Sequence, residues 1–190
     1  MPFIPYADPP YRRPPYSSPG FEDSPILDQI SVCLAYALAD ITEANGFHQT
    51  LAVSRDSMDF TGESERRDLS AWCGMDMGSD ACRIIGRTMG APAPKTCYTQ
   101  RFMVLVHVVG PTDAMAEETR IACVIADLIK RIGQLRAEGR AAGGKYCSGL
   151  ADRLETLEWE IGVSQIWFCT AIRIPIEVDY WVWTEDPYQQ

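Results

Sequence analysis

The sequence predicts an α+β fold: a mostly antiparallel sheet of four to six strands with two amphipathic helices on one face, plus an extended N-terminal arm. Three observations predict it. Residues 164–183 alternate between apolar even positions and more polar odd positions, which is typical of a strand with one buried face. Residues 24–46 and 113–137 space their apolar side chains every three or four residues, as amphipathic helices do. A proline-rich stretch, residues 1–23, precedes all of them.

The N-terminal stretch predicts an arm outside the core. Residues 1–23 hold seven of the thirteen prolines, and proline both fixes φ and lacks a backbone donor, so this stretch cannot join the core as helix or central strand. It is either a free tail or an arm lying on a neighbouring subunit. Tyrosine and arginine anchor protein interfaces, and the candidate anchors here are Tyr6, Tyr11, Arg12, Arg13 and Tyr16. We therefore divide the chain into an arm, 1–23, and one domain, 24–190.

The first half of the domain predicts one helix and two short strands. Ser24 and Pro25 suit the N-cap and the first helical position, and the Asn-Gly pair at 45–46 predicts the helix end. Residues 47–54 alternate imperfectly and predict a first strand. Residues 69–75 predict a second.

The middle of the domain predicts a central strand and the longest helix. Residues 76–99 contain conflicting glycine and proline signals, which indicate a long connection or an extended hairpin. Residues 100–109 are apolar enough for a strand in the middle of a sheet. The helix over 113–137 is capped by Thr112 or Asp113 and carries an apolar stripe facing the sheet.

The remaining segments complete the sheet. Residues 139–149 are glycine-rich and predict a flexible link, and residues 150–160 favour a strand over a helix. Gly162 then turns the chain into the C-terminal strand, 164–183. Pro175 removes one ladder donor from that strand, which predicts an edge strand or a bulge there. Because twenty extended residues would span about 65 Å, we also expect a bend near Pro175.

Composition excludes several classes of protein. The net charge of -9 argues against a protein that grips nucleic-acid phosphates through clustered lysine and arginine. The seven cysteines form no C-x-x-C pair and are odd in number, unlike a disulfide framework or a zinc site, so we expect reduced thiols made in a cytosol. We find no apolar leader and no run of 18 apolar residues, and expect neither export nor a membrane anchor.

Three motifs suggest a phosphate-binding, catalytic or metal-binding site, but each lacks a feature that such a site needs. Residues 139–145 match most of a phosphate-binding loop, yet Tyr146 replaces the hydroxyl that would hold magnesium, and the stretch follows a helix instead of a strand. His48 and His107 fall in predicted strands without a companion nucleophile, although a pairing of His107 with a cysteine stays open. The acidic loop 56–68 lacks the spacing of a calcium site. We therefore assign no catalytic, cofactor-binding or metal-binding residue.

Tryptophans mark a candidate interaction surface instead. Trp167, Trp181 and Trp183 all fall on the odd, less apolar face of the C-terminal strand. A monomer would be expected to bury such side chains, so they predict a subunit interface. Packing beneath the arm is the alternative.

The order of these elements resembles phage tail terminator proteins, also called tail completion or minor tail proteins. The likeness covers about residues 24–188 and rests on order and pattern. Its features are Ala44-Asn45-Gly46-Phe47 after the first helix, the arginine- and acid-rich loop that follows, the strand 101–109, the helix containing Glu117-Glu118 and 126–129, and the closing residues 176–180 and 185–188. The proline-rich arm and the long 76–99 connection depart from the family pattern.

The resemblance implies a structural virion protein with no enzymatic activity. Members form a ring, usually a hexamer, that caps the tail tube, stops its polymerisation and joins the tail to the head connector. The implied partners are further copies of this chain, the tail tube protein and a connector or neck protein, with DNA passing through the lumen unbound. A neck or head-completion connector is the alternative in the same class, and a small-ligand binder or thiol enzyme is the alternative from another.

An acidic lumen would keep DNA mobile by repelling its phosphates. On this reasoning we expect Glu177 and Asp179, on the odd face of the C-terminal strand, to face the channel. The loop 56–68 is the other candidate for this role.

Overall fold

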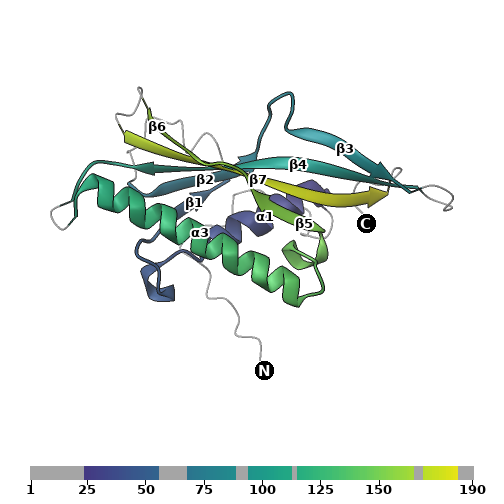
Figure 1. The fold of residues 1–190 in the computed structure, drawn as a ribbon, viewed down its shortest axis with the longest axis horizontal. Helices are drawn as coiled ribbons and strands as arrows, with labels where there is room; N and C mark the ends of the chain where they lie inside the picture. The colour runs from purple at the N-terminus through teal and green to yellow at the C-terminus, as the bar shows by residue number, and fades with distance from the viewer. Residues whose placement is uncertain (1–23, 56–67, 89–93, 113–114, 165–168, 184–190) are drawn as a thin grey trace.

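The computed structural model describes residues 24–55, 68–88, 94–112, 115–164 and 169–183. These residues form two α-helices, two short 3-10 turns and one seven-stranded mixed sheet. The helices are α1 (Ile26–Ala39) and α3 (Glu117–Ala141), and the strands are β1 (Ala52–Ser54), β2 (Ser70–Met75), β3 (Cys82–Arg87), β4 (Lys95–Val108), β5 (Arg153–Thr156), β6 (Glu160–Ser164) and β7 (Cys169–Trp183). Both helices lie on the same side of the sheet (Figure 1), which confirms the predicted α+β class.

The sheet is built around a long antiparallel pair, β4 and β7. Its order is β1-β2-β4-β7-β5, with β3 also pairing with β4 and β6 also pairing with β7. Only β1 and β2 run parallel. Along β4, β3 pairs with the first half and β2 with the second, while along β7, β6 and then β5 occupy the other side. As a result β3 and β6 lie at opposite ends and on opposite edges of the sheet (Figure 1).

The period-2 pattern of β7 correctly predicts its buried face. Its even positions from 170 to 182 are all buried, and they join even positions of β4 and the apolar stripe of α3 in one core. This core is sealed by large side chains with almost no exposed surface, namely Phe102, Ile26, Ile30, Leu34, Ile41, Leu51, Leu128, Leu154, Ile172 and Ile176.

Pro175 lies inside the sheet at an interruption of one neighbouring ladder. β7 pairs with β4 through Pro175, opposite Met103, so β7 is not an edge strand. On its other side the pairing breaks between β5 and β6, and there the Leu157 amide donates to the Pro175 carbonyl over 2.9 Å. The backbone N–H that Pro175 lacks is therefore on the side where no regular ladder runs. Of the two expectations for Pro175, an edge strand or a bulge, the structure favours a local irregularity in the pairing.

The predicted strand over 47–54 is wrong except for its last three residues, β1. A 3-10 turn occupies Glu43–Asn45, and Gly46 takes a left-handed conformation with φ 78°. The amides of His48 and Gln49 donate to the two carboxylate oxygens of Asp127, at 3.0 and 2.9 Å. These backbone donors are used by a side chain of α3, so this segment cannot pair in the sheet.

The sheet has seven strands instead of four to six because two predicted segments divide further. Within residues 76–99, β3 pairs with the start of β4 as an extended hairpin, one of the two alternatives expected for this segment; residues 89–93 lie outside the described residues. Residues 150–160 yield β5 and the first residue of β6. Gly162 lies within β6, not at a turn.

The glycine-rich stretch after α3 is an ordered helix end. The helix continues to Ala141, and Gly143 and Gly144 then adopt positive φ values of 77° and 82°, as glycine does where helices stop. The Gly144 amide donates to the Gly139 carbonyl over 2.9 Å. A Cβ on Gly139 would lie 2.1 Å from a ring carbon of Tyr146. The residue that breaks the phosphate-loop pattern thus packs on the glycine that opens it.

α3 begins later than predicted and is held by buried polar side chains. Its N-cap is Ala116, without a side-chain cap, so Thr112 does not cap it, and Asp113 lies outside the described residues. Arg120 is buried and donates to the carbonyls of Val109 and Gly110. Within the described residues, no helix combines the length and apolar character needed to cross a membrane.

Candidate functional site

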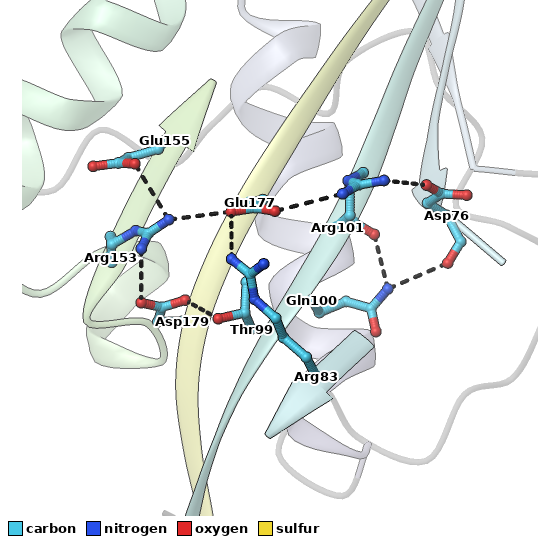
Figure 2. Close-up of polar contacts among 9 residues, drawn as sticks. All are labelled: Asp76, Arg83, Thr99, Gln100, Arg101, Arg153, Glu155, Glu177 and Asp179. Carbon is cyan, nitrogen blue, oxygen red and sulfur yellow. Dashed lines mark hydrogen bonds and ion pairs between the residues drawn. The ribbon is translucent and has the colours of Figure 1, made fainter. Parts of the chain in front are cut away.

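The face of the sheet opposite the helices carries a network of arginines and carboxylates (Figure 2). Strand pairing sets two rows of side chains across it, because residues opposed in a ladder share a face. One row contains Arg83, Thr99, Asp179 and Arg153, and the other contains Arg101, Glu177 and Glu155. The network therefore joins β3, β4, β7 and β5.

Glu177 is the centre of this network. Its side chain belongs to a residue only 6% exposed, and three arginines surround it. Arg83 Nη2 and Arg153 Nη2 each lie 3.2 Å from Oε2, and Arg101 Nη2 lies 3.6 Å from Oε1. These charge-assisted contacts tie Glu177 to three different strands, β3, β4 and β5.

Asp179 is bound in the same manner by fewer partners. The Thr99 hydroxyl donates to Asp179 Oδ1 over 2.6 Å, and Arg153 Nη1 lies 3.5 Å from Oδ2. Arg101 also reaches Asp76 at 3.6 Å. Asp179 itself is 7% exposed, so its charge, like that of Glu177, is satisfied within the subunit.

Glu177 and Asp179 lie on the predicted face, but neither presents a free carboxylate. That these two side chains face a channel stays a prediction, and any repulsion of DNA by them is reduced because arginines pair with both. Any repulsion from this face comes from the network as a whole, in which three arginines face the four carboxylates of Asp76, Glu155, Glu177 and Asp179. The loop 56–67 lies outside the described residues, and Asp68 at its end is ion-paired with Arg120.

The two described tryptophans of the predicted interface are half-buried within the subunit. A Cβ on Gly86 would lie 3.7 Å from the Trp181 ring, an ordinary contact distance, so the indole packs beside β3 at this residue. Lys95 Nζ stands 4.3 Å from the centroid of the Trp183 ring, a cation–π contact. Trp167 and the arm residues Tyr6, Tyr11, Arg12, Arg13 and Tyr16 lie outside the described residues.

The sheet edges expose apolar side chains that the sequence reasoning missed. On β3, Ile84 and Ile85 are 50% and 49% exposed, and on β6, Ile161 and Val163 are 49% and 75% exposed. Trp159, just before β6, is also exposed. The available signals were a pair of isoleucines and a short Ile-x-Val alternation, both too brief to distinguish from core strands.

The histidines and cysteines form no reactive cluster. Among the described residues, no group of three or more His, Cys, Asp or Glu side chains could hold a metal ion. His107 is half-buried, which lowers its pKa, and His48 lies in the loop held by Asp127. The Cys33 thiol is hydrogen-bonded to Cys147, which lowers the pKa of Cys33. All seven cysteines are free thiols, as the sequence predicts.

No protein-family model matches this chain, and neither does any curated protein. The class of the protein therefore rests on its own fold and surfaces. They show an α+β fold with a network of paired charges on one face and two exposed apolar sheet edges.

Replacing Glu177 with glutamine is expected to lower the free energy of unfolding by about 1 to 2 kcal/mol. The change leaves three guanidinium groups close together without the anion between them, and their partial exposure keeps the loss below that of a fully buried pair. Chemical denaturation measures it. Glu155→Gln is the matched control, because its half-exposed carboxylate contacts Arg153 alone and should change stability by less than about 0.5 kcal/mol. Equal effects would show that Glu177 is not central.

The buried thiols are expected to make stability fall at alkaline pH. Burial raises the pKa of Cys73 from 9.0 to about 12, so the folded state keeps this proton while the unfolded chain releases it above pH 9. The unfolded state is therefore favoured as pH rises from 9 to 12. The free energy of unfolding should therefore fall less steeply with pH in Cys73→Ala than in wild type between pH 9 and 12, by about 1 kcal/mol per pH unit. Parallel slopes would contradict this assignment.

Proposed function

We propose that this protein is a structural subunit of a virion, a tail terminator that forms a ring, caps the tail tube and joins the tail to the head. The observation that carries the proposal is the presence of two exposed apolar edges on opposite sides of one sheet. A subunit with two different exposed apolar edges can contact one copy through each edge, as ring formation requires. The order of elements that resembles tail terminators supports the particular role.

The polar face supports the same proposal. The arginines and carboxylates of the network around Glu177 are paired with one another, so they offer few open positive charges to DNA phosphates, in keeping with a chain of net charge -9. A ring through which DNA moves benefits from a surface that does not bind the backbone. Weak, salt-insensitive interaction with DNA is therefore expected.

Two measurements test the proposal. Native mass spectrometry and electron microscopy of the purified chain should give a closed ring, for which we expect six copies. Added to a self-polymerising tail tube protein of the same phage, the chain should shorten the tubes, and a labelled chain should lie at tube ends. Tubes grown with an unrelated protein of similar charge are the control. A stable monomer, or tubes of unchanged length without end label, would overturn the proposal.

Imaging the labelled chain in virions places it along the head–tail axis. A position directly on the tube supports a terminator. A position against the portal, separated from the tube by another protein, would assign it to the neck instead.

A further inference from the structure

The exposed edges of the sheet, β3 and β6, match one another on both faces. Ile84 of β3 opposes Tyr98, whose ring stacks on that of Tyr180, an even position of β7 on the helix side. Ile161 and Val163 oppose Ile172 and Thr170, which also lie on the helix side. A sheet continued from one copy to the next, with helices on the same side, would therefore bring apolar side chains together.

The other face of the two edges carries opposite charges. Arg83 opposes Thr99 and points to the polar face, where it contacts Glu177. Glu160 opposes Arg173 and shares that face. On this face β3 presents Arg83 and no acid, because the register shift after Ile84 turns Arg87 to the helix side opposite Thr96, whereas residues 157–164 carry two glutamates and no base. Opposite charges across a ladder stabilise pairing and like charges oppose it, so β3 favours β6 over another β3.

The strand directions also agree with such a joint. β3 and β7 each run antiparallel to β4, and β6 runs antiparallel to β7, so β3 and β6 point in opposite directions. If a neighbouring copy keeps the same strand direction, its β6 meets β3 antiparallel. Among the described residues, β3 pairs only with β4, and β6 only with β7, so each has an outer edge open to another strand.

We propose that the outer edge of β3 of one copy pairs antiparallel with the outer edge of β6 of the next copy, continuing the sheet from subunit to subunit. This inference rests on the proposed self-assembly and names its surfaces. The register that opposes Ile84 to Ile161 also opposes Cys82 to Val163. On the other face it sets Arg83 opposite Gly162 and diagonal to Glu160, within reach of a long side chain.

The positions of the two edges constrain the shape of the assembly. β6 pairs with β7 near residue 171. β3 pairs with the part of β4 that lies opposite β7 near residue 180. The two edges are therefore offset by about 30 Å along the strand direction. Copies joined at these edges close into a ring only if their strands are inclined to the ring axis, as strands are in any closed barrel. Strands parallel to the axis would give an open helical filament instead.

Cysteine cross-linking tests the register. Opposed Cα atoms in an antiparallel pair lie about 4.5 to 5.5 Å apart, a span that a disulfide bridges. Under copper-phenanthroline and oxygen, which take up the two electrons and two protons of the joining thiols, Val163→Cys should cross-link to native Cys82 of the next copy. Denaturing, non-reducing gels should then show a ladder of multimers. The ladder should disappear in Val163→Cys with Cys82→Ser, and Ile129→Cys, an exposed position on α3, should not produce it.

Charged substitutions test the direction of assembly. Ile84→Lys disables β3 and Val163→Lys disables β6, and each should raise the apparent dissociation constant roughly tenfold or more, because the joint would bury an unpaired charge. Mixed in equal amounts, the two variants should form a dimer that grows no further, because one intact β6 still meets one intact β3. Ile129→Lys, also an exposed isoleucine, should assemble like wild type.

These outcomes separate the edge proposal from the proposed function. Suppose that both edge variants still form rings like those of the wild type, and that Val163→Cys gives no cross-linked ladder. This result would overturn the edge pairing and leave the terminator function standing. A cross-linked ladder in Val163→Cys, together with wild-type assemblies that do not act on tail tubes, would support the edges and overturn the function. Near-ultraviolet circular dichroism confirms that each variant is folded. Amide exchange of wild type should also show β3 and β6 protected on assembly, and unchanged exchange would count against the joint.

Discussion

Replacing Ile174 with alanine is expected to lower the free energy of unfolding by about 3 kcal/mol, because it removes a branched side chain from the closed core. Ile174 belongs to the buried even face of β7 and is only 3% exposed. Its neighbours on β4, Val104 and Val106, are fully buried and cannot move easily into the cavity. Urea unfolding should show a lower midpoint with an unchanged slope.

Trp181→Ala is the companion variant on the opposite face of the same strand. Its ring lies over Gly86 but stays partly open to solvent, so we expect a smaller loss of folding stability together with weaker self-association. Both variants should be compared at a concentration where each is monomeric, since dissociation otherwise adds to unfolding. Equal losses of folding stability would contradict the division of β7 into a core face and an opposite face that contributes less to folding.

Local patterns predicted the long elements of this fold. β7, β4 and α3 each contain enough residues for the period of their apolar side chains to be unambiguous. β3 was uncertain because a register shift between Ile84 and Gly86 breaks its alternation, and an edge strand exposed on both faces has little apolar pattern. The division into β5 and β6 depends on which residues of β7 each segment pairs with. No local sequence pattern contains this information.

The polar site could be predicted only in part. Alternation placed Glu177 and Asp179 on the correct face, because the period of a strand fixes the side to which each residue points. Their partners could not be found this way. Arg83 lies 94 residues from Glu177 in sequence. When the partner of a charged residue is this distant, the local sequence predicts only a solvent-exposed charge.

The same limit hid the buried polar contacts of α3. Arg131 lies late in α3, where a basic residue complements the helix dipole, yet its guanidinium donates to the Ala37 carbonyl over 2.8 Å and to Asp40 over 2.9 Å. These bonds join α3 to the end of α1. They show that α3 packs through paired charges as well as through its apolar stripe.

Replacing Asp127 with alanine should lower the free energy of unfolding by about 2 to 3 kcal/mol. The residue is 1% exposed, and its two oxygens accept the His48 and Gln49 amides. Without the carboxylate both backbone donors lose their partners in a partly buried place, and an unsatisfied donor costs more than a hydrogen bond contributes. Asp127→Asn should fall between wild type and alanine, because its amide oxygen can accept one bond while its NH₂ group opposes the other donor.

The loss should also be visible locally, since the loop held by Asp127 leads directly into β1. The Leu51 amide bonds to the Ile41 carbonyl, and the Ala52 amide bonds to the Leu69 carbonyl beside β2. Releasing residues 48 and 49 should therefore speed amide exchange through residues 48–54 while β4 and β7 keep their protection. Glu118→Ala, an exposed acid on the same helix, is the control and should leave this exchange unchanged. Uniformly faster exchange across the sheet would mean that Asp127 supports the whole fold and not this loop, because only a contact confined to the loop can be lost without loosening the long strands.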